Sequence, residues 1–248
     1  MKLPPRAAPR PLLPPALRRT AALVVAGCAA VTASLAMAFA GQARPDGLDA
    51  AVDTHVRSGL GQYPEQLHLL AELGDLVPVT VLTAALILAC LATRRRRGAA
   101  LACLAVPGAV ALTEFVLKPL VGRTIHRAYL CFPSGHATAS FTLASTCAVL
   151  LASPARLRLS GAVRLLLALG AAVVAAAVAT AMVALGHHYF TDAIAGTAVG
   201  VGMVPLAALL VDWAAGSRRA GSPLHRASES PVTTAPHVSI SSPGPGGR

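Results

Sequence analysis

Residues 118–136 have the sequence KPLVGRTIHRAYLCFPSGH, and the rest of the chain is organised around them. This polar interval gathers three cations and two histidines between two long apolar segments. A shorter polar interval, GHHYFTD at residues 186–192, separates two later apolar segments. Polar loops between apolar segments of this length predict connections between membrane helices, and we expect the two intervals to meet in space.

The composition indicates a protein that has lipid as its solvent. Of the 248 residues 55% are hydrophobic and 12% are charged, with a mean hydropathy of +0.64. Soluble domains carry roughly 25% charged residues. The excess of apolar side chains therefore predicts an all-α integral membrane protein, since helices satisfy their own backbone hydrogen bonds in a bilayer.

Six apolar segments have the length of a membrane span, which needs about 20 helical residues to cross roughly 30 Å of hydrocarbon. They cover residues 20–41, 75–93, 98–119, 134–152, 165–185 and 191–211. The predicted fold is a six-helix membrane bundle over residues 20–212, flanked by disordered tails at 1–19 and 213–248. Within the sixth segment, Gly196 and Gly200 predict a close helix–helix contact.

The first apolar segment has an alternative interpretation as a secretory signal peptide. Ala36-Met37-Ala38 resembles a cleavage site. The segment is longer than the apolar part of a usual signal peptide, which favours a retained helix. In both cases the residues that follow it emerge on the outer face of the membrane.

The distribution of the net charge of +11 argues for membrane topology signals and against a nucleic-acid partner. Arginines gather at the ends of apolar segments, as in RRRR at residues 94–97. With both termini inside, sixteen lysines and arginines are cytoplasmic and five are external. We therefore predict a multi-pass protein of the cell membrane with cytoplasmic termini and both polar intervals outside. The oligomeric state is not indicated.

Residues 42–74 hold most of the acidic residues. Leu48, Val52, Val56 and Leu60 recur at helical spacing, which predicts a helix lying along the membrane interface. The five cysteines lack metal-site spacing, and four lie in apolar segments, so we expect small buried hydrophobes. Cys131 is expected to neighbour the polar site without acting as a nucleophile.

The motif Pro133-Ser134-Gly135-His136 predicts the start of a helix that can bind an anion. Serine is a strong N-cap, and the helix behind it presents free backbone N–H groups and the positive end of its dipole. Gly135 lets an anion approach the backbone closely. The alternative is a capped membrane helix that carries an interfacial histidine.

His188 and Asp192 are spaced so that the carboxylate can reach the imidazole within one helical turn. An aspartate bonded to one ring nitrogen fixes the tautomer and leaves the other nitrogen as a nucleophile or base. The alternative is a polar turn in which Asp192 only caps the sixth helix. Upstream, Glu114 lies four residues before Lys118 in an apolar helix. An intramembrane acid is a candidate functional residue, but we favour the alternative of a local ion pair that holds the lysine.

Taken together, these motifs resemble the type 2 phosphatidic acid phosphatase (PAP2) superfamily over about residues 70–212. The pattern of that family has a lysine followed seven residues later by Arg-Pro, then Pro-Ser-Gly-His, then Ser-Arg-x5-His-x3-Asp. Lys118, residues 133–136, His188 and Asp192 match it in order.

The chain departs from the family pattern at two arginines. Ile125 stands where the first motif has arginine, with Arg123 and Arg127 two residues to either side. In the third motif, Ala181 and Met182 replace Ser-Arg. We expect Arg123, and to a lesser degree Arg127, to compensate for the missing guanidinium groups.

The resemblance implies a membrane phosphatase that hydrolyses a lipid phosphate or lipid pyrophosphate without a metal or cofactor. It implies that His188 attacks phosphorus to give a phosphohistidine, that Asp192 orients His188, and that His136 protonates the leaving oxygen. The groups expected to bind phosphate are Lys118, Arg123, Ser134, Gly135 and Arg127. The alternative is a weakly active or inactive family member that binds lipid phosphate or a protein partner.

Overall fold

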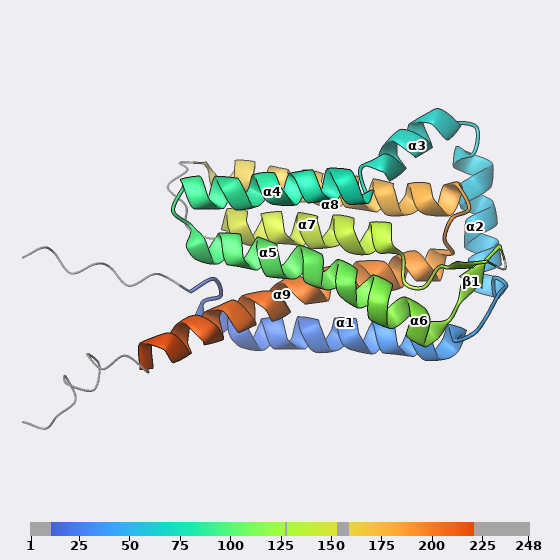
Figure 1. Cartoon of the computed structure of the whole chain (residues 1–248). Helices are drawn as coiled ribbons and strands as arrows, with labels where there is room; N and C mark the ends of the chain where they lie inside the picture. Colours follow the sequence, from blue (N-terminus) through green and yellow to red (C-terminus); the bar gives the residue numbers. More distant parts are fainter. Residues whose placement is uncertain (1–10, 127, 153–158, 221–248) are drawn as a thin grey trace, which may run out of the picture. The chain divides into compact units, whose positions relative to one another are not determined.

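The apolar segments form long helices, and the polar intervals form their connections (Figure 1). The computed structural model describes residues 11–126, 128–152 and 159–220. In chain order the elements are η1 (Pro15–Leu17), α1 (Arg18–Phe39), α2 (Gly47–Leu60), α3 (Pro64–Glu72), α4 (Leu76–Ala92), α5 (Arg96–Ala111), the π-helical η2 (Leu112–Leu117), α6 (Lys118–Val121), β1 (Thr124–Ile125), β2 (Tyr129–Leu130), α7 (Gly135–Ala152), α8 (Gly161–Ala184) and α9 (Phe190–Ala220).

These helices confirm the predicted all-α membrane fold. Within the described residues, five helical stretches are long and apolar enough to cross a bilayer, and α3 with α4, bent by 45°, can supply a sixth. The third predicted span is the continuous stretch α5–η2–α6, which ends at Val121. The predicted tail boundaries differ from the structure, because residues 11–19 already contain η1 and the start of α1, and α9 continues past residue 213.

Small residues bring α9 close to α7, as the two glycines predict. A Cβ atom at Gly200 would lie 2.7 Å from the carbonyl oxygen of Thr138 and 2.9 Å from the nitrogen of Thr142. A Cβ atom at Gly196 would collide with the carbonyl oxygen of Ser134. Glycine is therefore required for this contact, which holds the start of α7 against α9.

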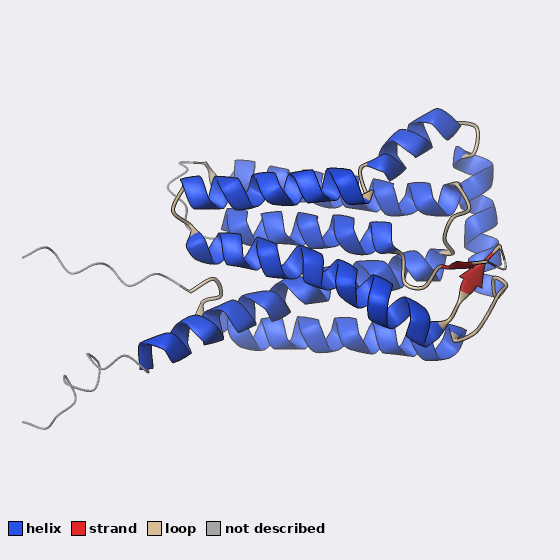
Figure 2. Ribbon diagram, viewed as in Figure 1, coloured by secondary structure: helices blue, strands red, loops and turns tan. Residues whose placement is uncertain are grey.

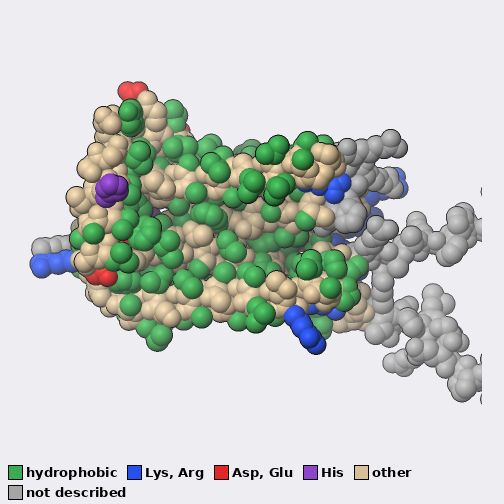
Figure 3. Space-filling model, turned by 180° about the vertical axis from the view of Figure 1, so that it is seen from behind, with side chains coloured by type: hydrophobic (Ala, Val, Ile, Leu, Met, Phe, Trp, Pro, Cys, Tyr) green, Lys and Arg blue, Asp and Glu red, His purple; other side chains and the backbone are tan. Residues whose placement is uncertain are grey.

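At one end of the bundle, the first described residues of the chain contact α9. The carboxylate of Asp212 accepts hydrogen bonds from the backbone N–H groups of Leu12 and Leu13, both at 2.9 Å. It also pairs with Arg97 at 3.1 Å. Figure 3 shows the charged side chains gathered near the ends of the helices, with hydrophobic side chains spread over the face between them.

The opposite end carries the two polar intervals, α2 and a small β-hairpin. In Figure 1, α2 runs across the ends of the long helices, and Figure 2 shows the two short strands beside it. The strands are antiparallel, with Thr124 opposite Leu130 and Ile125 opposite Tyr129. The hairpin therefore folds the first polar interval back toward the second.

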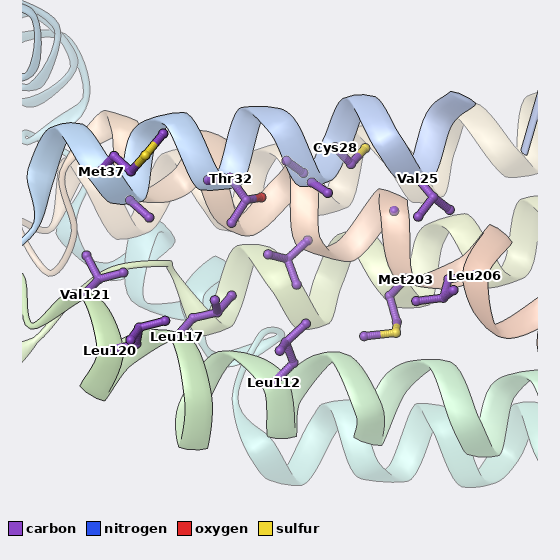
Figure 4. Close-up of a pocket in the computed structure, with 16 residues that line it drawn as sticks. Val25, Cys28, Thr32, Met37, Leu112, Leu117, Leu120, Val121, Met203 and Leu206 are labelled. Atoms are coloured by element: carbon purple, nitrogen blue, oxygen red, sulfur yellow. The ribbon is translucent and has the colours of Figure 1, made fainter. Parts of the chain in front are cut away.

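An apolar cavity of about 440 Å³ lies among α1, α9 and the helical stretch from η2 to α6 (Figure 4). Leu117, Leu120 and Val121 line it, next to Lys118 in the chain. Thr32 also lines it, and the Thr32 hydroxyl is buried without a hydrogen-bond partner among the described residues.

Candidate active site

The turn between α8 and α9 places His188 at the site. Gly186 has a positive φ of 76°, a conformation that glycine adopts without strain. The backbone N–H groups of His187 and His188 both donate to the carbonyl oxygen of Met182, at 3.0 and 3.3 Å. This turn points the two consecutive histidines to different surroundings, because His187 is exposed and His188 is buried.

A backbone carbonyl, not Asp192, is the close partner of the His188 ring. The Nδ1 atom of His188 lies 2.8 Å from the carbonyl oxygen of Cys131 and 3.7 Å from Oδ2 of Asp192. The direct hydrogen bond expected between His188 and Asp192 is therefore not formed. Because a carbonyl only accepts, Nδ1 carries the proton and Nε2 of neutral His188 has a free lone pair.

Cys131 is held in place by the hairpin, and its thiol is inert. Its N–H donates to the carbonyl oxygen of Arg123 at 2.9 Å, next to the strand pairing. Burial, followed by the nearby charge of Asp192, raises the pKa of the Cys131 thiol. A protonated buried thiol is a poor nucleophile, which agrees with the expected role of Cys131 as a neighbour.

Arg123 occupies a place different from the one expected. The side chain is completely buried, and its Nη1 atom donates to Asp192 and to the hydroxyl of Thr191, both at 2.7 Å. Its Nη2 atom pairs with Asp49. The guanidinium carbon also lies 4.2 Å from the ring centroid of Phe39 and 4.4 Å from that of Tyr189.

Both Nη atoms of Arg123 thus have protein partners, while its Nε atom is buried without a hydrogen-bond partner among the described residues. The expectation that Arg123 replaces the missing arginine at position 125 stays a prediction. A buried charge is tolerated only when it is paired, and the single positive charge of Arg123 is shared between two carboxylates. Burial acts to lower the pKa of Arg123, but Asp192 and Asp49 outweigh it, and the pKa lies above its ordinary value. The guanidinium is therefore permanently charged.

The acidic residues of α2 also point inward, although the sequence favoured its apolar face for burial. Asp49 accepts from the backbone N–H of Thr191 at 2.9 Å, and Asp53 accepts from that of Phe190 at 3.0 Å. Both carboxylates are buried, whereas Leu48 is 54% exposed. The apolar face of α2 is thus turned outward at Leu48, and its acids cap the start of α9.

Asp192 joins this cap from within α9. Its Oδ2 atom accepts from the backbone N–H of Tyr189 at 3.0 Å, as an acidic residue at the third position of a helix does in a capping box. Asp192 therefore forms the hydrogen bond expected from the alternative interpretation, in which it caps the helix. Its carboxylate also lies 3.7 Å from the His188 ring. The cap, the buried guanidinium and α2 together fix the position of the turn that carries His188.

His136 lies at the start of α7 under the turn between α3 and α4. Its Nε2 atom lies 2.9 Å from Oδ1 of Asp75. A Cβ atom at Gly74 would stand 2.9 Å from the His136 ring, so glycine is needed for this approach. His136 and His188 are near enough to interact electrostatically, and the structure thus brings the two predicted catalytic histidines together.

The start of α7 carries the other predicted phosphate ligands. The Ser134 hydroxyl accepts from the N–H of Ala137 at 3.4 Å, so it caps α7, and the side chain is buried. Lys118 pairs with Glu114 at 2.7 Å, which confirms the expected ion pair. A Cβ atom at Gly135 would lie 2.5 Å from Oε1 of Glu114 and 3.8 Å from Nζ of Lys118, so this pair stands over the helix start.

A second cavity, of about 530 Å³, opens onto His188. The side chains lining it are Ile125, His126, Tyr129, Leu130, Leu185, His187 and His188. Ile125 and Met182, which replace the arginines of the family pattern, are 5% and 4% exposed. Arg127, the other predicted phosphate ligand of the hairpin, lies outside the described residues.

The described residues contain no group of three or more His, Cys, Asp or Glu side chains placed to hold a metal ion. The chemistry available at the site is that of imidazoles, one lysine and a helix start. Three groups that contact the candidate site residues have no signal in the sequence. They are the Cys131 carbonyl and the carboxylates of Asp49 and Asp75. The spacing of Asp49 and Asp53 puts them on one helical face, but nothing in the sequence indicates that Asp49 pairs with Arg123 or that Asp53 accepts from the N–H of Phe190.

Comparisons with known proteins agree with this arrangement. None of the curated proteins matches the chain significantly. A crystal structure described as the first transmembrane PAP2 type phosphatidylglycerolphosphate phosphatase from Bacillus subtilis matches with a TM-score of 0.60 and 18% sequence identity. The match covers 80% of this chain and 98% of that one, and it shows a shared fold. The family model of the PAP2 superfamily matches residues 19–215, so this multi-pass membrane chain belongs to the PAP2 superfamily.

Proposed function

We propose that this protein is a membrane phosphatase that hydrolyses a lipid phosphate or lipid pyrophosphate through a phosphohistidine on His188. The observation that carries the proposal is the state of the His188 ring. Its Nδ1 atom is held by a backbone carbonyl at 2.8 Å, and the side chain lines a cavity of about 530 Å³. A neutral imidazole with one nitrogen anchored is prepared for nucleophilic attack by the other.

In the first step, the Nε2 lone pair of His188 attacks phosphorus, and the bond from phosphorus to the leaving oxygen breaks. His136 donates a proton to that oxygen, which departs as an alcohol or as a lipid monophosphate. Asp75 holds Nε2 of His136 at 2.9 Å and so leaves Nδ1 as the nitrogen that exchanges the proton. The negative charge of Asp192 near His188 offsets the positive charge that the ring acquires.

In the second step, water attacks the phosphohistidine. His136 takes a proton from the water, the bond between phosphorus and nitrogen breaks, and inorganic phosphate leaves. Negative charge on the transferring phosphoryl group is stabilised by Lys118 and by the backbone at Gly135, where α7 begins. Lys118 reaches this place because Glu114 holds it over the helix start.

A lipid substrate suits the position of the site at the end of apolar helices. The apolar cavity among α1, α9 and α6 begins beside Lys118 and has the character required by a hydrocarbon chain. The uneven distribution of lysine and arginine supports an external site, since cytoplasmic loops carry the excess. We therefore infer that phosphate is released on the outer face of the cell membrane.

The decisive experiment measures phosphate release by the purified full-length protein from a panel of lipids. The panel contains phosphatidic acid, phosphatidylglycerol phosphate and a polyprenyl pyrophosphate. We expect hydrolysis of at least one of them, inhibition by vanadate as a mimic of five-coordinate phosphorus, and no loss of activity with chelators. Loss of activity on chelation would refute the metal-independent mechanism.

One observation favours a second candidate function, which is binding of lipid phosphate without turnover. No lysine or arginine is among the residues that line the cavity at His188, within the part of the chain that the structure describes. Guanidinium groups commonly stabilise a phosphoryl transition state, and losing one such contact costs roughly 10²–10³ in rate. Tight binding of a lipid phosphate with no release of phosphate across the whole panel would establish this alternative.

The orientation has its own test. Reporter fusions at Arg95 and Tyr129 should report opposite compartments, because these residues lie in connections at opposite ends of the bundle. The Arg95 fusion should be cytoplasmic and the Tyr129 fusion external. The reverse assignment would place the site inside the cell and overturn the proposed outer-face reaction.

A further inference from the structure

The cavity at His188 has a wall of imidazoles contributed by two separate segments. His126 comes from the turn of the β-hairpin, and His187 and His188 come from the turn between α8 and α9. A fourth imidazole, His68 of α3, is close enough to influence His187 electrostatically. No carboxylate is among the residues lining this cavity in the described chain, so its polar side chains are imidazoles and one phenol.

His126 is held in an unusual conformation that fixes its ring at the cavity. Its φ is 52°, in the left-handed region that non-glycine residues rarely occupy. Its Nε2 atom lies 3.0 Å from the carbonyl oxygen of Gly186, which can only accept a hydrogen bond. The proton of neutral His126 therefore sits on Nε2, and Nδ1 carries the lone pair.

His187 is the other imidazole that does not serve as the nucleophile. It is exposed, and it lines the same cavity as His126. Partial desolvation of the ring, even at this exposed position, followed by the neighbouring imidazoles of His188, His68 and His126, lowers the pKa of His187. When two imidazoles of this wall are protonated, their positive charges repel each other, and a bound dianion would offset that repulsion.

We propose that His126 and His187 form a proton-dependent subsite for the tetrahedral phosphate dianion beside His188. The subsite takes the phosphoryl group of the substrate and the phosphate product, and in this respect the inference rests on the proposed function. Each protonated imidazole donates a charge-assisted hydrogen bond, which a neutral ring supplies only weakly. Binding of the dianion therefore takes up protons, and affinity increases as the pH falls.

Other charged and titratable groups face this region from the surrounding elements. The Arg57 guanidinium of α2 lies beside Gly186, where a Cβ atom would stand 3.5 Å from its central carbon, and Asp53 is 3.8 Å from Arg57. The remaining groups are His68 of α3, Tyr129 of β2, His136 of α7 and Asp192 of α9. A test of the subsite must therefore compare variants that leave these groups in place.

Sulfate is the appropriate probe, because it stays a tetrahedral dianion from pH 5 to pH 8 and any pH dependence belongs to the protein. Calorimetric titration of the full chain in detergent should show affinity for sulfate about tenfold higher near pH 5 than near pH 7.5, a range that extends well below the ordinary histidine pKa of about 6.5 because the pKa of His187 is lowered. The double variant His126→Gln with His187→Gln should lose this increase. His187→Arg should bind sulfate well at both pH values, because its charge does not titrate.

His55→Gln is the matched control, since His55 is an exposed histidine of α2 that does not line the cavity. It should keep the full pH dependence. Equal pH dependence in the wild type and the double variant would overturn the subsite, as would absence of sulfate binding at any pH. Sulfate binding is measured without turnover. A chain that binds sulfate in this manner but hydrolyses no lipid would therefore refute the proposed function and leave the subsite intact.

Discussion

The basic side chains on the two sides of His188 differ in burial and in their partners. On the inner side, Arg123 is fully buried, permanently charged and bonded to Asp49 and Asp192. On the cavity side, His126 and His187 are exposed imidazoles that line an open space. The difference shows that a cation near a candidate catalytic residue can have protein carboxylates as its partners, because a buried charge must be paired.

The largest expected effect is at His188, where the two sides meet. His188→Ala should lower phosphate release at least about 10³-fold, as removal of a covalent nucleophile does. Thermal unfolding should change little, because the turn is held by backbone bonds to Met182. His187→Ala is the adjacent control and should retain most of its turnover at saturating substrate. Substantial turnover by His188→Ala would remove the phosphohistidine from the mechanism.

Arg123→Ala tests the buried side. Removing one partner of a buried ion pair typically costs about 3–5 kcal/mol, because the remaining charges are left unpaired. We expect a matching loss of stability together with loss of activity, measured by unfolding in detergent and by phosphate release. Arg57→Ala is the control, since its pair with Asp53 is long and 45% of the Arg57 side chain is exposed, so its loss should cost at most about 1 kcal/mol.

Arg123→Lys sharpens the same test. Lysine keeps the charge but cannot bond Asp49, Asp192 and Thr191 with the planar fork of arginine. Partial recovery of stability is therefore expected. Full stability with a specific loss of phosphate affinity in Arg123→Lys would show that Arg123 is a ligand after all and would erase the distinction between the two sides.

Asp53 adds a pH-dependent component to the buried side. Burial raises its pKa to about 6, despite the hydrogen bond from the N–H of Phe190. The folded protein thus binds this proton more tightly than the unfolded chain, and stability decreases as the pH rises from about 4 through about 6. The change corresponds to at most about 3 kcal/mol.

Asp53→Asn should remove this contribution. The stability of the variant relative to the wild type should increase between pH 4 and pH 7, because asparagine keeps an oxygen that can accept from Phe190 and carries no buried charge. The measurement is a series of unfolding curves across that range. Glu65→Gln, at an exposed site in α3, should show no such trend. A constant difference between Asp53→Asn and the wild type would contradict the raised pKa.

The smallest effect is expected at Cys131. The group that holds His188 is the backbone carbonyl of this residue, and its buried thiol is protonated. Cys131→Ala should therefore leave turnover within about twofold of the wild type, since buried cysteine acts as a small hydrophobe. Phosphate release by the variant is the measurement. Loss of activity with an unchanged fold would assign chemistry to the thiol.

Several features of the site were predictable because they depend on residues close together in the chain. The spans follow from runs of apolar residues, and the pairing of Lys118 with Glu114 follows from helical spacing. The approach of α9 to α7 follows from Gly196 and Gly200. The juxtaposition of His136 with His188 followed from the resemblance of the two polar intervals to a known pattern.

The sequence by itself determined the class of the protein, because hydrophobicity and helical periodicity are local properties. Whether a segment can span a bilayer depends on its own length and composition. It could not decide which partner each polar group would take. Asp49 and Arg123 are 74 residues apart, and His136 and Asp75 are 61 apart. Only the packed helices bring these groups within hydrogen-bond distance. Burial then makes an unpaired charge costly, so the tertiary structure pairs Arg123 with two carboxylates, while the imidazoles of His126, His187 and His188 line the cavity.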